Sequence, residues 1–361
     1  MQTTAASPLF DPQRLATAEA DAQAKAIEAL GYSPREARFL ATVACAGGYF
    51  LRRHYATALG IARGGSDASL ISRLTQRRHA SRYGFCRAEQ VFHLSAAACY
   101  PDAETAGRGR ATRPRPATTI ARRLMALDAM LAHPEASFVC GQSNRIALCE
   151  RAGLAVDQLP ARTFHPAKTT KAVVRVLPDL PLLGCLTDAT SPTLVAAYVA
   201  EPGETTSGFA TYMTRHAPLF ASGIDWRVWY ICTTARQADT ARRTFDTKMS
   251  ADIRAGAAIL AELAAEYGDL RALYEAQRWQ ELDTTRIRRL FELKRRFGAD
   301  ADRIYATWRQ HQAHQRGNSV KAAARPSLPL EVRRSLSPRA TFEPIVLAHR
   351  YTALEPLKGL R

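Results

Sequence analysis

Residues 12–95 carry helix-forming patterns followed by two strand-like runs, and this order constrains the fold more than any other feature of the sequence. The Ala-rich stretch 12–30 consists of strong helix formers and predicts a first helix. A second helix is predicted from Ser33, because that serine is a good N-cap, Pro34 suits the first helical position and Glu36 completes a capping box. The helix is expected to end at the pair of glycines that follows.

The next segments complete a familiar order of elements. Residues 49–59 predict a third short helix, and residues 66–78 predict a fourth that begins at a serine N-cap. Two short strands, Ser81–Cys86 and Gln90–Ser95, are predicted around a polar turn. Helices followed by a β-hairpin are typical of a winged helix-turn-helix domain, which we therefore predict over residues 12–100.

The predicted fourth helix has the side chains that a DNA recognition helix needs. Leu70, Ile71 and Leu74 form its apolar stripe, while Ser, Arg and Gln side chains occupy the opposite side. Cations of the predicted hairpin would meet phosphate or the minor groove. A small helical domain with a solvated basic face is the alternative. The candidate DNA-binding residues are Arg52, Arg53, Ser69, Arg73, Gln76, Arg77, Arg78, Arg82 and Arg87.

Charge points to the same class of partner. The 361-residue chain has 50 Lys and Arg against 33 Asp and Glu, a formal net charge of +17. Most of these cations are Arg, whose fork of donors suits phosphate. Such a balance predicts a polyanionic partner, most often nucleic acid. An Arg-rich composition inherited from a GC-rich genome is the alternative explanation.

Several classes of protein are disfavoured. No apolar run is long enough for a membrane span, and the N-terminal residues lack the pattern of a secretory signal. The seven cysteines form no CxxC pair and have apolar neighbours, which predicts reduced, buried thiols rather than a disulfide frame or a zinc site. We therefore expect a cytoplasmic protein that does not engage membranes.

Four further segments follow the predicted winged helix. Residues 101–118, rich in Pro, Gly, Thr and Arg, predict a basic linker. Residues 119–245 predict an α/β domain around a central sheet, residues 246–315 a helical extension, and residues 316–361 an irregular basic tail. The fold class predicted for the whole chain is α+β. The strand-like runs of the second domain lie at 171–177, 182–186, 193–200 and 225–233.

This plan resembles that of a known family. A segment reading SPREARFLATVACAGGYFLRRHYATALG, an Arg-rich linker and a second αβββαβ-type domain are similar to the replication-relaxation proteins of plasmids and integrative elements, and to the related MobC-type relaxases. The resemblance covers residues 33–245. It implies that the second domain resembles the restriction-endonuclease-like nuclease core, in which carboxylates at two strand ends hold Mg²⁺ and a lysine positions or activates water.

Two carboxylates match the site that the resemblance implies. Asp179 ends the predicted strand 171–177, and Glu201 ends the next but one, so together they would be the catalytic and metal-binding residues for Mg²⁺ or Mn²⁺. The residues after Glu201 are Pro-Gly-Glu, so the expected lysine is missing, and Lys171 would have to substitute for it. The domain is accordingly a working nuclease, a degenerate nuclease-like fold or an unrelated α/β domain. In the unrelated domain both carboxylates would be ordinary turn residues.

Three functions remain open at this point. The first is a non-catalytic, sequence-specific duplex-DNA-binding protein of a plasmid or integrative element, acting in replication, mobilisation or transcription control. Its second domain would pair with a relaxosome or replication protein, and the chain could form a homodimer. The second is a metal-dependent DNA nickase or relaxase that uses Asp179 and Glu201. The third is an adaptor whose basic C-terminal helices bind an acidic partner.

Overall fold

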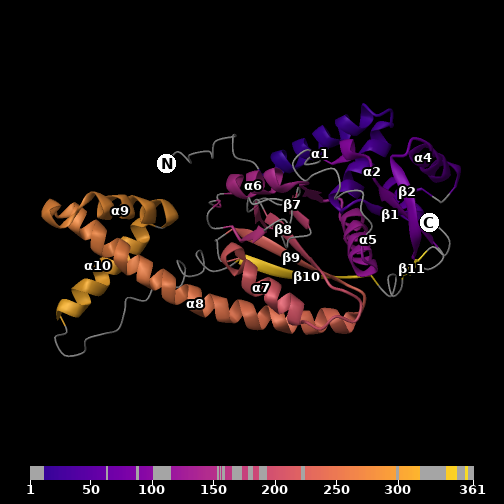
Figure 1. Cartoon of the computed structure of the whole chain (residues 1–361). Coiled ribbons are helices and arrows are strands. Elements are labelled where there is room, and N and C mark those ends of the chain that lie inside the picture. Colours follow the sequence, from indigo (N-terminus) through magenta and orange to yellow (C-terminus); the bar gives the residue numbers. More distant parts are fainter. Residues whose placement is uncertain are drawn as a thin grey trace. The chain divides into compact units, whose positions relative to one another are not determined.

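The computed structural model divides into two compact units, which are described separately (Figure 1). Unit 1 comprises the chain up to Phe220, residues 224–248 and the segment from Ala340 onward, while unit 2 comprises mainly residues 249–339. The structure describes residues 12–61, 64–86, 89–100, 115–152, 154, 156, 159–164, 173–177, 182–186, 193–220, 224–297, 301–317, 339–347 and 354–356.

The first part of unit 1 is helical with a small antiparallel sheet. In chain order it contains α1 (Pro12–Glu28), α2 (Pro34–Cys45), β1 (Tyr49–Leu51), α3 (Arg52–Leu59), α4 (Gly65–Gln76), β2 (Ala80–Cys86), β3 (Glu89–Leu94) and the 3-10 helix η1 (Ala97–Cys99). With β11 (Leu354–Pro356) the strands form a sheet in the order β1-β3-β2-β11. The hairpin predicted from the sequence is therefore present as β2 and β3.

The N-terminus of α2 confirms the predicted capping box. The Ser33 hydroxyl accepts a hydrogen bond from the Glu36 backbone N–H at 3.4 Å, and the Ser33 N–H donates to the Glu36 carboxylate at 2.9 Å. Two backbone donors that the helix itself cannot satisfy are thereby paired.

The helix predicted at 49–59 is wrong over its first three residues. Tyr49–Leu51 form β1, which pairs antiparallel with β3, and the helix α3 begins only at Arg52. All three side chains of β1 are buried. Three consecutive buried apolar residues suit a strand covered on both faces. The stabilisation of β1 comes from partners forty or more residues away that no local pattern reveals.

The second part of unit 1 is built on a five-stranded sheet with the order β10-β9-β8-β7-β4. The β4–β7 and β7–β8 pairs are antiparallel, whereas β8 and β9 are parallel and are joined through α7. The elements are α5 (Ala117–Ala132), β4 (Ala136–Phe138), α6 (Gln142–Arg151), β7 (Leu182–Leu186), β8 (Thr193–Val199), α7 (Ser207–Phe220), β9 (Asp225–Cys232) and β10 (Arg339–Val346). A separate two-stranded ladder joins β5 (Ala161–Phe164) to β6 (Val173–Val176).

One hydrophobic core runs through both parts of unit 1. Ile27 and Leu40 in the first part belong to the same buried cluster as Leu127 and Trp229 in the second. The helix α1 contacts α2 and also contacts β4 and β7. The segments predicted as separate domains at 12–100 and 119–245 therefore share their apolar interior.

The tail predicted as irregular over 316–361 contains two strands. β10 lies beside β9, where the Trp229 indole donates to the Glu343 carboxylate at 2.9 Å and the Leu347 N–H donates to the Cys232 carbonyl at 2.8 Å. β11 pairs antiparallel with β2. β10 contains Pro344, and because β10 is an edge strand a proline is tolerated there, since one side of the strand needs no ladder partner.

Unit 2 is helical, in agreement with the predicted extension at 246–315. It contains most of α8 (Ala235–Glu275), the 3-10 helix η3 (Trp279–Glu281), α9 (Thr284–Phe297) and α10 (Ala301–Gly317). Tyr267, Leu293 and Ile304, one from each long helix, lie in its buried cluster. Across the described residues, no helix is both long and apolar enough to cross a membrane.

Candidate nucleic-acid interface

The helix α4 buries one face and exposes another. Leu70 and Leu74 are completely buried, as the predicted apolar stripe requires. Over residues 68–76, whose side chains the structure describes, Ser69, Ser72 and Gln76 are exposed on the opposite face. This outward face carries hydroxyl and amide groups but no charge. It can donate and accept hydrogen bonds at base edges.

Arg73, predicted to face DNA, turns instead toward α2. Its guanidinium donates to the Glu36 carboxylate, which is almost completely buried. Burial opposes ionisation, but the Ser33 N–H and the Arg73 guanidinium together hold the pKa of Glu36 below its usual value. A buried carboxylate of this kind needs a charged partner, so Arg73 serves the interior of the domain.

Arg77 is also occupied within the domain. Its guanidinium donates to the Leu30 carbonyl at 2.8 Å, just beyond the end of α1, and lies 5.3 Å from the centre of the Tyr32 ring. A cation at a helix C-terminus pairs favourably with the exposed carbonyls there. The side chain remains exposed to solvent, so it adds positive charge to the surface while its donors are held locally.

Arg53 belongs to a buried network and not to a DNA surface. Its guanidinium donates to Asp128 on α5 at 2.9 Å and pairs with Glu89 on β3 at 3.4 Å. The neighbouring His54 is fully buried and accepts the Leu51 N–H on Nδ1 at 3.1 Å, so its proton lies on Nε2 and is donated to Asp128 at 3.1 Å. Burial lowers the pKa of His54, which keeps the imidazole neutral.

Three predicted arginines are exposed near α4. Arg52, on α3, donates to the Gly64 carbonyl at 3.1 Å, while Arg78 and Arg82 lie after α4 and on β2. Arg87 is outside the residues that the structure describes. Of the candidates that are described, the structure thus leaves Arg52, Ser69, Gln76, Arg77, Arg78 and Arg82 on the surface and turns Arg53 and Arg73 inward.

Arg78 has a backbone conformation that is unusual for its residue type. Its φ is 57°, in the left-handed region that favours glycine. The His79 N–H donates to the Leu74 carbonyl at 2.8 Å, and the Arg78 N–H donates to the Thr75 carbonyl at 3.1 Å. This pair of bonds is a Schellman C-cap, in which glycine is the commonest residue at the position of Arg78. The chain therefore places an arginine where a glycine would be less strained.

The strands assumed to bring the two predicted carboxylates together are not neighbours. β6 pairs with β5 in a separate ladder, whereas β8 lies between β7 and β9. Asp179 lies outside the described residues. The described part of β7 starts at Leu182, which is paired with Ala197 near the end of β8, so the beginning of β7 and the end of β8 share one edge of the sheet.

Glu201 makes two hydrogen bonds through its backbone, and its carboxylate faces Arg122. Its N–H donates to the Glu204 carboxylate at 2.8 Å, and its carbonyl accepts the Gln237 amide at 3.0 Å. Its carboxylate lies 3.7 Å from the guanidinium of Arg122, a residue that the sequence did not single out. Within the part of the chain that the structure describes, no group of three or more His, Cys, Asp and Glu side chains could hold a metal ion.

Comparisons with protein-family models, with curated proteins and with solved structures find no match to this chain.

Proposed function

We propose that this chain is a duplex-DNA-binding protein with a winged helix, in which α4 enters the major groove and the β2–β3 hairpin is the wing. The observation that carries the proposal is the order α2, β1, α3, α4, β2, β3 combined with the ladder β1-β3-β2. A winged helix has this order of elements, with its first strand between the first and second helices. The strand β1, absent from the sequence prediction, makes the agreement with that order closer.

The division of side chains around α4 supports this role. Ser69, Ser72 and Gln76 supply hydrogen-bonding groups without charge on the outward face of the helix, which suits reading base edges. Arg78 and Arg82 supply exposed cations beyond its end, which suits contacts to phosphate. Base contacts would then specify the sequence, and the cations would position the protein on the duplex.

Replacing Arg78 tests the proposed phosphate contacts without a loss of folding stability. Arg78→Gly removes the cation and also relieves the left-handed backbone, so the fold should be at least as stable as before. Fluorescence anisotropy with a labelled random-sequence duplex over a range of salt concentrations should show weaker binding, with the salt slope reduced by about 1 for this variant and for Arg82→Gln.

Arg236→Gln on α8 is the matched control, because it removes one exposed arginine away from the proposed interface. The control should bind duplex as the parent does. If Arg78→Gly and Arg82→Gln retain the parent salt slope, the wing and the end of α4 do not contact phosphate and the proposed orientation is wrong.

Sequence readout by α4 needs a separate experiment. Selection from a random duplex library should enrich a sequence that the parent prefers, and Gln76→Ala should lose about 1–3 kcal/mol of that preference while keeping its affinity for random duplex. Equal enrichment by both proteins would show that Gln76 reads no base. The Arg73→Ala variant should instead lose folding stability, because it leaves the buried Glu36 carboxylate without its arginine.

The setting of this activity follows from the resemblance alone. We propose replication, mobilisation or transcription control of a plasmid or integrative element, with a relaxosome or replication protein as partner. A Mg²⁺- or Mn²⁺-dependent nickase is the second candidate, favoured only by the shared sheet edge of β7 and β8. Supercoiled plasmid carrying the element's origin should be bound without being nicked. Nicking that is lost in Asp179→Ala/Glu201→Ala, while binding persists, would make the protein an enzyme.

A further inference from the structure

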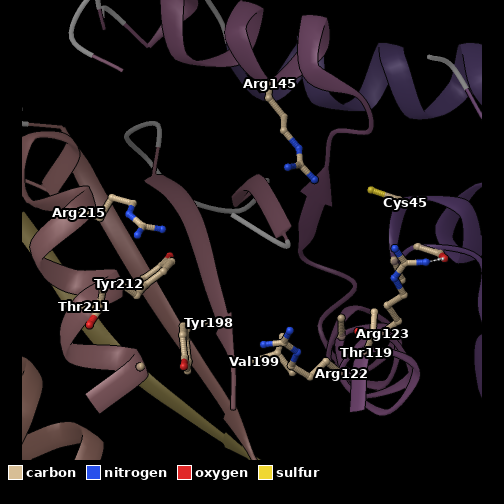
Figure 2. Close-up of a pocket in the computed structure, with 14 residues that line it drawn as sticks. Cys45, Thr119, Arg122, Arg123, Arg145, Tyr198, Val199, Thr211, Tyr212 and Arg215 are labelled. Carbon is tan, nitrogen blue, oxygen red and sulfur yellow. Dashed lines mark hydrogen bonds between the residues drawn. The ribbon is translucent and has the colours of Figure 1, made fainter. Parts of the chain in front are cut away.

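A concave pocket with a volume of about 550 Å³ opens within unit 1 (Figure 2). It is lined by the turn after α2 and by residues of α5, α6, β8 and α7. Its volume falls in the range of roughly 300–1,000 Å³ that small-molecule sites occupy. No DNA-binding candidate from the sequence lines it, so the DNA-binding proposal leaves this pocket unexplained.

The pocket is strongly basic. Four arginines line it: Arg122 and Arg123 on α5, Arg145 on α6 and Arg215 on α7. None of the described residues that line it is an aspartate or a glutamate. Arg122 pairs with Glu201 at 3.7 Å, a separation too long for a hydrogen bond. Four like charges are gathered around one pocket, an arrangement that an anionic ligand would stabilise.

Arg123 contacts the turn after α2 and the ring of Tyr49 on β1. Its guanidinium donates to the Gly47 carbonyl at 2.7 Å and lies 5.6 Å from the centre of the Tyr49 ring. Gly47 has a φ of 102°, and a β-carbon at this position would lie 2.7 Å from the Cδ of Arg123. The glycine is thus required both by its backbone and by the close approach of the arginine. Burial lowers the pKa of Arg123, and the positive charge of the neighbouring Arg115 lowers it further.

The hydroxyl of Tyr212 has no hydrogen-bond partner among the described residues. It lines the pocket and is only 4% exposed, yet within the described part of the chain its hydroxyl makes no hydrogen bond. The neighbouring Tyr198 hydroxyl, in contrast, donates to Glu204. Burial raises the pKa of Tyr212, so its hydroxyl stays a protonated donor. A buried hydroxyl without an acceptor is costly, and Figure 2 shows its oxygen directed to the side of the pocket where Arg215 extends.

We propose that this pocket binds the phosphate group of a phosphorylated small molecule of about nucleotide size. Arg122, Arg123, Arg145 and Arg215 would neutralise the phosphate with charge-assisted hydrogen bonds, and the Tyr212 hydroxyl would donate to one of its oxygens. Both the planar forks of arginine and a neutral hydroxyl donor suit the tetrahedral arrangement of phosphate oxygens. Duplex DNA presents its phosphates on a convex surface, whereas a buried donor in a concave pocket suits a small ligand.

The test uses isothermal titration calorimetry on the full chain, with inorganic phosphate, AMP and adenosine as probes. Phosphate and AMP should bind and adenosine should not. Tyr212→Phe keeps the ring that packs against Phe209 and His216 and removes only the unpartnered hydroxyl, so it should fold as well as the parent and bind AMP at least tenfold more weakly. Arg215→Gln should also weaken AMP binding, whereas Arg236→Gln outside the pocket should not.

The outcomes separate this proposal from the one on DNA. Loss of AMP binding in Tyr212→Phe with unchanged affinity for duplex DNA supports a separate small-molecule site. Absence of binding by both phosphate and AMP at millimolar concentration overturns the proposal, as does a Tyr212→Phe variant that binds AMP like the parent. Binding of a 5′-phosphorylated single strand without any binding of AMP would also overturn it, because the pocket would then serve nucleic acid.

Discussion

Replacing Asp128 should weaken the contact between α3 and α5 and destabilise unit 1. This carboxylate on α5 accepts one hydrogen bond from Arg53 at 2.9 Å and one from His54 at 3.1 Å, both from α3. Its side chain is only 8% exposed, so water screens the contacts weakly. Asp128→Ala removes the acceptor of both donors and leaves a buried cavity between α3 and α5.

The size of the effect follows from the type of contact. Removing one partner of a buried, hydrogen-bonded ion pair costs about 3–5 kcal/mol, a large share of the stability of an average domain. Asp128→Asn keeps an oxygen that can accept one of the two hydrogen bonds, so it should cost less, about 1–3 kcal/mol. The expected order of the free energies of unfolding is parent, then Asp128→Asn, then Asp128→Ala.

Urea unfolding followed by circular dichroism would measure these differences, with native-state hydrogen exchange to assign them to α3 and α5. A double-mutant cycle with Arg53→Ala would isolate the contribution of the Arg53–Asp128 pair. If Asp128→Ala loses less than about 1 kcal/mol, the charged network contributes little and the shared apolar core alone joins the two parts.

Three further predictions address other regions of unit 1. Burial, with Arg123 nearby, lowers the pKa of His93 to about 4, so the native state should not take up the proton that the unfolded state gains below about pH 6.5. Stability should consequently fall by about 2 kcal/mol between pH 7.5 and 5, and a His93→Gln variant with an undiminished fall would contradict this. Gly47→Ala should lower the thermal midpoint by displacing Arg123, and an unchanged midpoint would show that the turn adapts. Truncation after Gly317 should expose the edge of β9 and destabilise unit 1, so equal urea midpoints would refute a stabilising role for β10.

Local signals in the sequence were sufficient for most of the helices and strands. The capping box at Ser33, the apolar spacing of α4 and the continuous apolar run of β8 each depend on residues a few positions apart. Their physical cause is local too, because caps pair backbone groups within one turn and amphipathic spacing follows from helix and strand geometry. The predicted α+β class was therefore within reach of the sequence.

The partners of the arginines could not be predicted from the sequence. The sequence placed Arg73 on the polar side of its helix but could not show that Glu36, on a different helix, would be buried beside it. The same holds for Arg53 and Asp128, which are 75 positions apart in the chain. The position of an arginine in the helical repeat indicates which side of the helix it occupies. The partner of its guanidinium depends on which elements pack together.

What the sequence by itself determined was the set of local elements, the basic charge and the apolar stripe of α4. Tertiary structure decided that Tyr49–Leu51 and the C-terminal β10 become strands, because the edges of β3 and β9 give them backbone partners from distant parts of the chain. It also decided the basic pocket, whose arginines come from three helices separated along the sequence. The residues of a site assembled from long-range contacts follow no regular spacing along the sequence. They can therefore be recognised only in the folded structure.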